Sequence, residues 1–325
     1  MTPAAPYVFR LEGGVFGTRR LVDAAAAFTA HCRADPKANP DAECYMSMFR
    51  YGPDFRAYLT ARGSSKGFAG PCWSPWLWID VDRPYLAAAA EAARRLAGVC
   101  LDRYRGLDED ALLVFSPARR YHLGLPLGFR PPPAANFPAV CRELAAGLAA
   151  AAGTPVDLGI YKAVQPLRAP NSRHPATGRH KRRLTIPELM HLSPARHAEL
   201  ATEPFGFDPP APAADPVLAA DWAEAAGRVA ALQCHRRKDY APGESRLQRA
   251  TLDFLREGAA EGERAVRLFR AAADLAEHGG PHRLVELLLT EAALDTGLPP
   301  AEVRRVIGCG VAHAERQRAG KDGAP

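Results

Sequence analysis

The heptapeptide Trp76–Asp82 (Trp-Leu-Trp-Ile-Asp-Val-Asp) constrains the fold more than any other stretch of the chain. Apolar aliphatic residues occupy every second position, which predicts a β-strand with one face buried against helices. The opposite face carries Trp76, Trp78, Asp80 and Asp82. The two carboxylates would lie roughly 6–7 Å apart along the strand. Like charges this close need a cation between them, and Mg²⁺ is commonly held by one or two carboxylates plus substrate phosphates. A strand end with two solvated acids is the alternative.

The length of 325 residues is enough for about two domains. Short strands interleaved with helices predict an α+β domain over residues 1–203. A proline-rich stretch at 204–217 has the composition of a linker. Purely helical periodicity then predicts an all-α domain over 218–318, and residues 319–325 are expected to form a disordered tail.

Charge and cysteine content narrow the functional class. The net charge of +6 permits a polyanionic partner without proving one. The seven cysteines form no Cys-x-x-Cys pair, so neither a disulfide framework nor a zinc site is predicted. No apolar run approaches the roughly 20 residues needed to cross a bilayer, and the first residues do not resemble a signal peptide. We therefore expect a cytoplasmic protein with no membrane partner.

A hairpin and a basic tract follow the central strand. Residues 111–115 and 121–126 read as two strands joined by a turn, with His122 near the start of the second. Asp157 comes after a predicted helix at 140–152. From residue 158 to residue 187 there is no acid, whereas seven cations occur there: Lys162, Arg168, Arg173, Arg179, Lys181, Arg182 and Arg183. Such a tract suits a triphosphate or a nucleic-acid backbone, and a solvated basic loop is the alternative.

A second loop with phosphate-binding composition is Gly63-Ser-Ser-Lys-Gly67. It lacks the spacing and the following helix of a P-loop, so a solvated loop is the favoured interpretation.

Asp80, Asp82 and Asp157 together could hold two divalent ions about 4 Å apart, an arrangement that serves in-line displacement at phosphorus. Nearby cations would stabilise the negative charge of the phosphoryl oxygens.

The chain resembles the archaeo-eukaryotic primases, including the primase-polymerases of phages and mobile elements. Trp78-Ile-Asp-Val-Asp82 is similar to their first motif, and Ser116-Pro-Ala-Arg-Arg-Tyr-His122 to their second. Val156-Asp157 is similar to the third, and Arg168 with Pro170-Asn-Ser-Arg-His174 to a string that often follows. Pro117 and Arg120 depart from the pattern where glycines are common.

The resemblance implies an RRM-like antiparallel sheet at the active site and a DNA primase, that is, a nucleotidyltransferase that makes and extends primers on single-stranded DNA. Asp80, Asp82 and Asp157 would hold two Mg²⁺ or Mn²⁺ ions. The implied contacts to the incoming NTP or dNTP come from Ser116, Arg120, His122, Arg168, His174 and Lys181.

The C-terminal helices are similar to the helical domains of phage and plasmid primases, which assist primer initiation. The implied contacts to nucleic acid come from Arg179, Arg182, Arg183, Arg246 and Arg249. A replicative helicase is a candidate partner, and a helical bundle with an interaction role only is the alternative.

Three other functions stay open. A repair polymerase of the same superfamily would use the same residues. A non-catalytic DNA-binding replication module would not need the carboxylates. A nucleotide-sugar glycosyltransferase also uses Asp-x-Asp, but it would need neither the His122 motif nor the acid-free basic tract.

Overall fold

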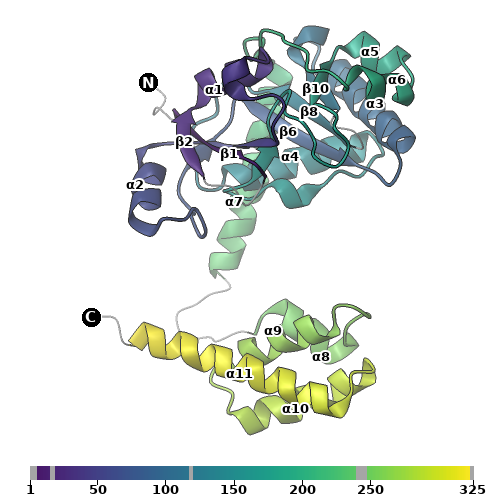
Figure 1. The fold of residues 1–325 in the computed structure, drawn as a ribbon. Helices are drawn as coiled ribbons and strands as arrows, with labels where there is room; N and C mark the ends of the chain where they lie inside the picture. Colours follow the sequence, from purple (N-terminus) through teal and green to yellow (C-terminus); the bar gives the residue numbers. More distant parts are fainter. Residues whose placement is uncertain (1–5, 15–18, 117–119, 239–246, 323–325) are drawn as a thin grey trace. The chain divides into compact units, whose positions relative to one another are not determined.

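The computed structural model describes residues 6–14, 19–116, 120–238 and 247–322. The chain divides into two compact units, residues 1–232 and 233–325, and each is described by itself (Figure 1). The first unit is a mixed α+β structure with antiparallel sheets, and the second is helical.

The strands are β1 (Tyr7–Glu12), β2 (Arg20–Asp23), β3 (Cys44–Ser47), β4 (Arg50–Tyr51), β5 (Cys72–Trp73), β6 (Trp76–Asp82), β7 (Leu113–Ser116), β8 (Arg120–Pro126), β9 (Pro166–Arg168) and β10 (Arg182–Leu184). The helices of the first unit are α1 (Ala24–Cys32), α2 (Pro53–Arg62), α3 (Leu86–Arg103), α4 (Phe137–Ala151), α5 (Ile186–His191), α6 (Pro194–Leu200) and most of α7 (Pro216–Lys238).

The predicted central strand is β6, which forms one edge of a four-stranded antiparallel sheet ordered β10-β7-β8-β6. Leu77, Ile79 and Val81 are at most 1% exposed, and α3 and α4 pack against this sheet. Period-2 alternation therefore buries the aliphatic face against helices, as predicted. The predicted hairpin is also present, with Phe115 of β7 opposite His122 of β8.

The other face of β6 is covered by aromatic packing as well as polar groups. The Trp78 ring lies across β8 at Gly124, where a Cβ atom would stand 2.6 Å from the ring. Trp78 also contacts the rings of Phe28 and Phe115. A glycine is needed at this register position because any side chain there would collide with the indole.

The second sheet is ordered β5-β4-β1-β3-β9, with β2 also pairing with β1. Its pairings are antiparallel, and β9 brings Arg168 opposite Tyr45 of β3. The chain between α4 and β9 therefore connects the two sheets. One sheet carries Asp80 and Asp82, and the other contains the N-terminal strands.

The proline-rich segment 204–217 does not separate the two units, which differs from the predicted boundary. Phe207 N donates to Cys32 O (2.9 Å), and Gly128 N donates to Ala213 O (3.0 Å). Leu218 and Trp222 of α7 then join the core of the first unit. Composition alone does not reveal these backbone hydrogen bonds, and the chain divides after residue 232 instead.

The second unit contains α8 (Arg249–Glu257), α9 (Arg264–Glu277), α10 (His282–Asp295) and α11 (Pro300–Asp322) around its own core. Residues 319–322 of the predicted tail continue α11, and residues 323–325 lie outside the described part. Among the described residues, no helix has the length and apolar character needed to cross a bilayer.

Candidate functional site

Two adjacent strands bring four predicted site residues together. In the register of β6 and β8, Asp80 lies opposite His122 and Asp82 lies opposite Arg120. Arg120 bridges both carboxylates, with Nη1 3.5 Å from Oδ2 of Asp80 and Nη2 2.7 Å from Oδ2 of Asp82. His122 Nε2 is 3.4 Å from the other carboxylate oxygen of Asp80. The cation expected between the carboxylates is, in this structure, a guanidinium.

Burial differs sharply within this group. The side chains of Asp80 and His122 are 5% and 7% exposed, whereas those of Asp82 and Arg120 are 41% and 50% exposed. Burial would raise the pKa of the Asp80 carboxyl, but His122, Arg120 and Lys181 outweigh it and hold the pKa below its usual value. Burial and Lys181 lower the pKa of His122. The buried pair therefore consists of an anionic Asp80 and a neutral His122.

Asp157 lies beside β6 through its backbone. Its amide donates to the Asp80 carbonyl (3.0 Å), while its own Oδ1 accepts from Gly159 N (2.7 Å) at the start of a 3-10 turn. The Tyr161 hydroxyl, which donates to Trp78 O (2.8 Å), has a pKa raised by burial and further by Cys141, Asp80 and Asp157. Within the described residues, no group of three or more His, Cys, Asp or Glu side chains is arranged to hold a metal ion.

Lys181 is buried rather than solvated. It is 1% exposed, and its Nζ donates to Arg168 O (2.6 Å) while lying 5.0 Å from the Phe115 ring centroid. Burial lowers its pKa to about 7, although Asp80 acts in the opposite direction. This position excludes direct phosphate contact in the described conformation, and it puts a titratable amine behind Asp80 and His122.

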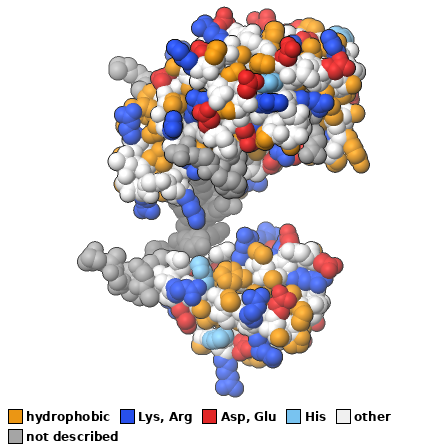
Figure 2. Space-filling view, in the orientation of Figure 1, with side chains coloured by type: hydrophobic (Ala, Val, Ile, Leu, Met, Phe, Trp, Pro, Cys, Tyr) orange, Lys and Arg blue, Asp and Glu red, His pale blue; other side chains and the backbone are white. Residues whose placement is uncertain are grey.

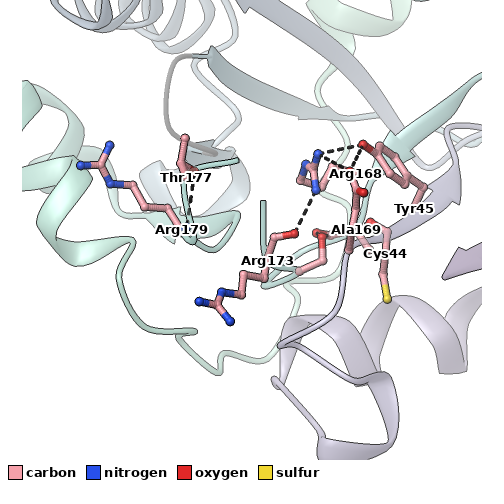
Figure 3. A network of polar contacts seen from close by, with 9 residues as sticks. Cys44, Tyr45, Arg168, Ala169, Arg173, Thr177 and Arg179 are labelled. Atoms are coloured by element: carbon pink, nitrogen blue, oxygen red, sulfur yellow. Dashed lines mark hydrogen bonds and ion pairs between the residues drawn. The ribbon is translucent and has the colours of Figure 1, made fainter. Parts of the chain in front are cut away.

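Arg168 is engaged in contacts with the N-terminal sheet. Its Nη2 lies 3.0 Å from Glu43 Oε1 and 2.7 Å from the Tyr45 hydroxyl, and Nη1 donates to Arg173 O (3.0 Å). Figure 3 shows the Arg168 guanidinium turned toward Tyr45, whereas the Arg173 and Arg179 side chains point away from it. The side chain of Arg168 is only 10% exposed, so these contacts fix it in place.

The remaining arginines of β10 are also held by protein groups. Arg182 donates to Leu200 O (3.0 Å) and stacks on Phe205, with its guanidinium carbon 4.6 Å from the ring centroid. Arg183 stacks on Phe207 (4.9 Å) and lies 3.4 Å from Asp110 Oδ1. Both side chains are less than 15% exposed. These two arginines of the acid-free tract therefore contact aromatic and acidic side chains that lie outside the tract in the sequence.

The remaining residues predicted to contact nucleotide or nucleic acid are Ser116, His174, Arg179, Arg246 and Arg249. The side chain of Ser116 and all of Arg246 lie outside the described residues. His174 and Arg179 are half-buried and lie within the β9–β10 connection. Arg249 begins α8 and is 94% exposed, with Nε 3.9 Å from Asp253 Oδ2. Within the described residues, neither Arg179 nor Arg249 forms an ion pair with Asp80 or Asp82.

Arg83 is a site residue that the sequence reasoning missed. Arg83 follows Asp82 directly, and the two residues line a pocket together with Pro84 and Arg120. Its guanidinium donates to the carbonyls of Asp82 and Pro155 and to Thr154 Oγ1 (2.9 Å for the last). Its position next to the Asp-x-Asp motif is the signal that could have identified it.

A second pocket lies on the tryptophan side of β6. It is lined by aromatic and sulfur-containing side chains, which include Phe28, Trp76, Trp78 and Met48. Three cations also line it: Arg50, Arg168 and Lys181. Within the described part of the chain, no acid lines this pocket. Figure 2 shows that basic and acidic side chains are interspersed over the visible face.

Comparisons with known proteins give one structural match. No family model matches the chain, and no curated protein sequence matches it. A search of solved structures finds the crystal structure of primase RepB', with 14% sequence identity and a TM-score of 0.35 over 98% of this chain and 94% of that chain.

Proposed function

We propose that this protein is a DNA primase-polymerase, a metal-dependent nucleotidyltransferase that synthesises and extends primers on single-stranded DNA. The observation that carries the proposal is the pair of strand-borne carboxylates, Asp80 and Asp82, facing His122 and the Arg120 guanidinium on β8 in direct cross-strand register. Paired carboxylates next to phosphate-binding cations are what phosphoryl transfer requires.

The carboxylate pair fits a divalent cation. Oδ1 of Asp80 is buried with only a long contact to His122 Nε2 (3.4 Å) among the described ion pairs, and the Arg120 guanidinium already stands between the two carboxylates. Half of the Arg120 side chain is exposed, so it can move aside. We assign Asp80 and Asp82 as ligands of Mg²⁺ or Mn²⁺. Asp157 is the third proposed ligand: its backbone amide donates to the Asp80 carbonyl, and its carboxylate, which now accepts from Gly159 N, would turn toward the carboxylate pair to bind the metal. When bound, the metal would activate the attacking hydroxyl and neutralise phosphate charge.

Arg120 and His122 are the groups we assign to the triphosphate. Both lie beside the carboxylates, and a neutral imidazole can donate one hydrogen bond to a phosphate oxygen. A guanidinium released from the carboxylates would bind phosphate in the bidentate manner that arginine favours. We do not assign Lys181 and Arg168 to direct contact with the triphosphate, because both side chains are held by protein groups. We propose that they stabilise the structure around this site.

The topology supports an RRM-like assignment for the catalytic sheet. The chain order β6-α3-β7-β8-α4 with spatial order β7-β8-β6 is followed by a return of the chain to β6 at Asp157. We infer that this return occupies the place of the fourth strand of an RRM-like sheet. The template would then run along the sheet, with Arg179 as a candidate contact to its backbone. Arg249 is a separate candidate contact to nucleic acid on the second unit.

The experiment that tests the proposal is incubation of the protein with unprimed single-stranded DNA, Mn²⁺ and labelled NTPs or dNTPs, with products resolved by length. We expect template-dependent oligonucleotides from the wild-type protein. Products only from a pre-annealed primer would indicate a repair-type polymerase instead. DNA binding with no incorporation under either condition would indicate a non-catalytic module and would overturn the proposal.

A further inference from the structure

A separate pocket with cationic side chains lies on the first unit. Neither Asp80 nor Asp82 is among its lining residues. It is formed by Arg19, by the loop 64–68 and by residues 162–164. Arg19, Lys66 and Lys162 therefore converge from three distant parts of the chain. All three are exposed, and none makes an ion pair with a described residue. The lining contains no Asp or Glu among the residues that the structure describes.

The loop that carries Lys66 is fixed rather than loose. The Tyr58 hydroxyl donates to Lys66 O (2.6 Å), and Lys66 N donates to Ser64 Oγ (3.2 Å). Phe68 is 7% exposed and packs edge-on against Phe55, with ring centroids 4.7 Å apart. Gly67 has φ +82°, which suits glycine at this sharp turn. The loop is therefore presented in a defined conformation.

The facing wall is fixed by the same aromatic cluster. The Tyr51 hydroxyl donates to Ala163 O (2.8 Å) next to Lys162, and the Tyr51 ring lies edge-on to Phe68 with centroids 5.8 Å apart. Both walls of the pocket are thus tied to one buried aromatic group. Three exposed cations, of which Arg19 stacks on the Phe9 ring, surround a preorganised space together with Ser64 and Ser65. They favour a compact, multiply charged anion, because like charges held together repel until an anion neutralises them.

We propose that the pocket of Arg19, Lys66 and Lys162 is a phosphate-binding site, which takes a phosphate group of either a single-stranded DNA backbone or a free nucleotide. The site uses no residue of the carboxylate pair, so it does not depend on metal or on catalysis. It gives the Gly63–Gly67 loop a binding role in place of the solvated-loop interpretation favoured by its sequence.

The test measures binding in EDTA, where the proposed catalytic metal is absent. The double variant Lys66→Ala/Lys162→Ala is compared with the wild type by fluorescence anisotropy, using a labelled dT20 oligonucleotide in one arm and a labelled dATP analogue in the other. We expect about tenfold weaker binding at low salt in the arm that represents the true source of the phosphate. For the oligonucleotide, the slope of log K against log salt should also fall by about 1.

The control is Lys37→Ala/Arg142→Ala, which removes the same charge from exposed positions outside this pocket. It should leave both affinities within about twofold of the wild type. The charge-preserving variant Lys66→Arg should retain binding, and thermal unfolding should show that all variants are folded. Unchanged affinity in both arms for the folded double variant, or an equal loss in the control, would overturn the proposal.

Discussion

Replacing Arg120 by glutamine should strengthen metal binding in the absence of nucleotide. The Arg120 guanidinium bridges Asp80 and Asp82, so a divalent cation entering between the carboxylates must displace it. The side chain of Arg120 is half-exposed, and exposed ion pairs contribute up to about 1 kcal/mol each. Removing this competition of about 1 kcal/mol should lower the dissociation constant for Mn²⁺ roughly fivefold.

The assay is titration of Mn²⁺ followed by calorimetry or by the loss of the free-ion electron paramagnetic resonance signal. Arg142→Gln, at an exposed position of α4, controls for the change in net charge. In EDTA, Arg120→Gln should also be less stable than the wild type, because Asp80 and Asp82 then repel each other with no cation between them. Mn²⁺ should restore that stability. An unchanged or weaker affinity for Mn²⁺ would refute the idea that Arg120 occupies a cation site.

Three further predictions concern the structure that supports the site. Burial lowers the pKa of Lys181 to about 7, so between pH 7 and its ordinary value of 10.5 the unfolded chain binds the proton that the folded protein has released. Lys181 therefore makes the free energy of unfolding rise with pH across this window, and Lys181→Met should remove that part of the rise in urea titrations; an unchanged pH profile would contradict its burial. Gly124→Ala should cost about 1–3 kcal/mol in urea denaturation because its Cβ would collide with Trp78, whereas Gly98→Ala, which has open space, should cost nothing. Arg168→Ala should lower the free energy of unfolding by about 2 kcal/mol, since it removes the ion pair with Glu43 and the hydrogen bonds to Tyr45 and Arg173 O, and leaves Glu43 with only the Tyr45 hydroxyl among these partners; full stability with lost nucleotide binding would instead identify a substrate contact.

The strand and its two faces could be predicted because alternation with period 2 depends only on local geometry. Leu77 and Val81 are buried as the pattern indicates. The pairing of Asp82 with Arg120 could not be predicted, because it depends on the register of β8 against β6. A shift of one residue would have turned Arg120 to the opposite face.

The contacts of the basic tract could not be predicted from the order of charges in the sequence. The absence of nearby acids suggested cations available to a polyanion, but Arg168 pairs with Glu43 and Arg183 stacks on Phe207. These partners come from remote segments that only the fold brings close. Conversely, Lys66 lies in a loop whose sequence favours solvation, yet the fold places it with Arg19 and Lys162.

The most direct test of the central claim is nucleotide incorporation by Asp82→Asn on single-stranded DNA with Mn²⁺. Asparagine keeps the shape of the half-exposed side chain but removes the charge that would hold the metal, and loss of several kcal/mol of transition-state stabilisation should reduce incorporation at least about a thousandfold. Circular dichroism should show an unchanged fold. Incorporation at the wild-type rate by a folded Asp82→Asn protein would contradict the account.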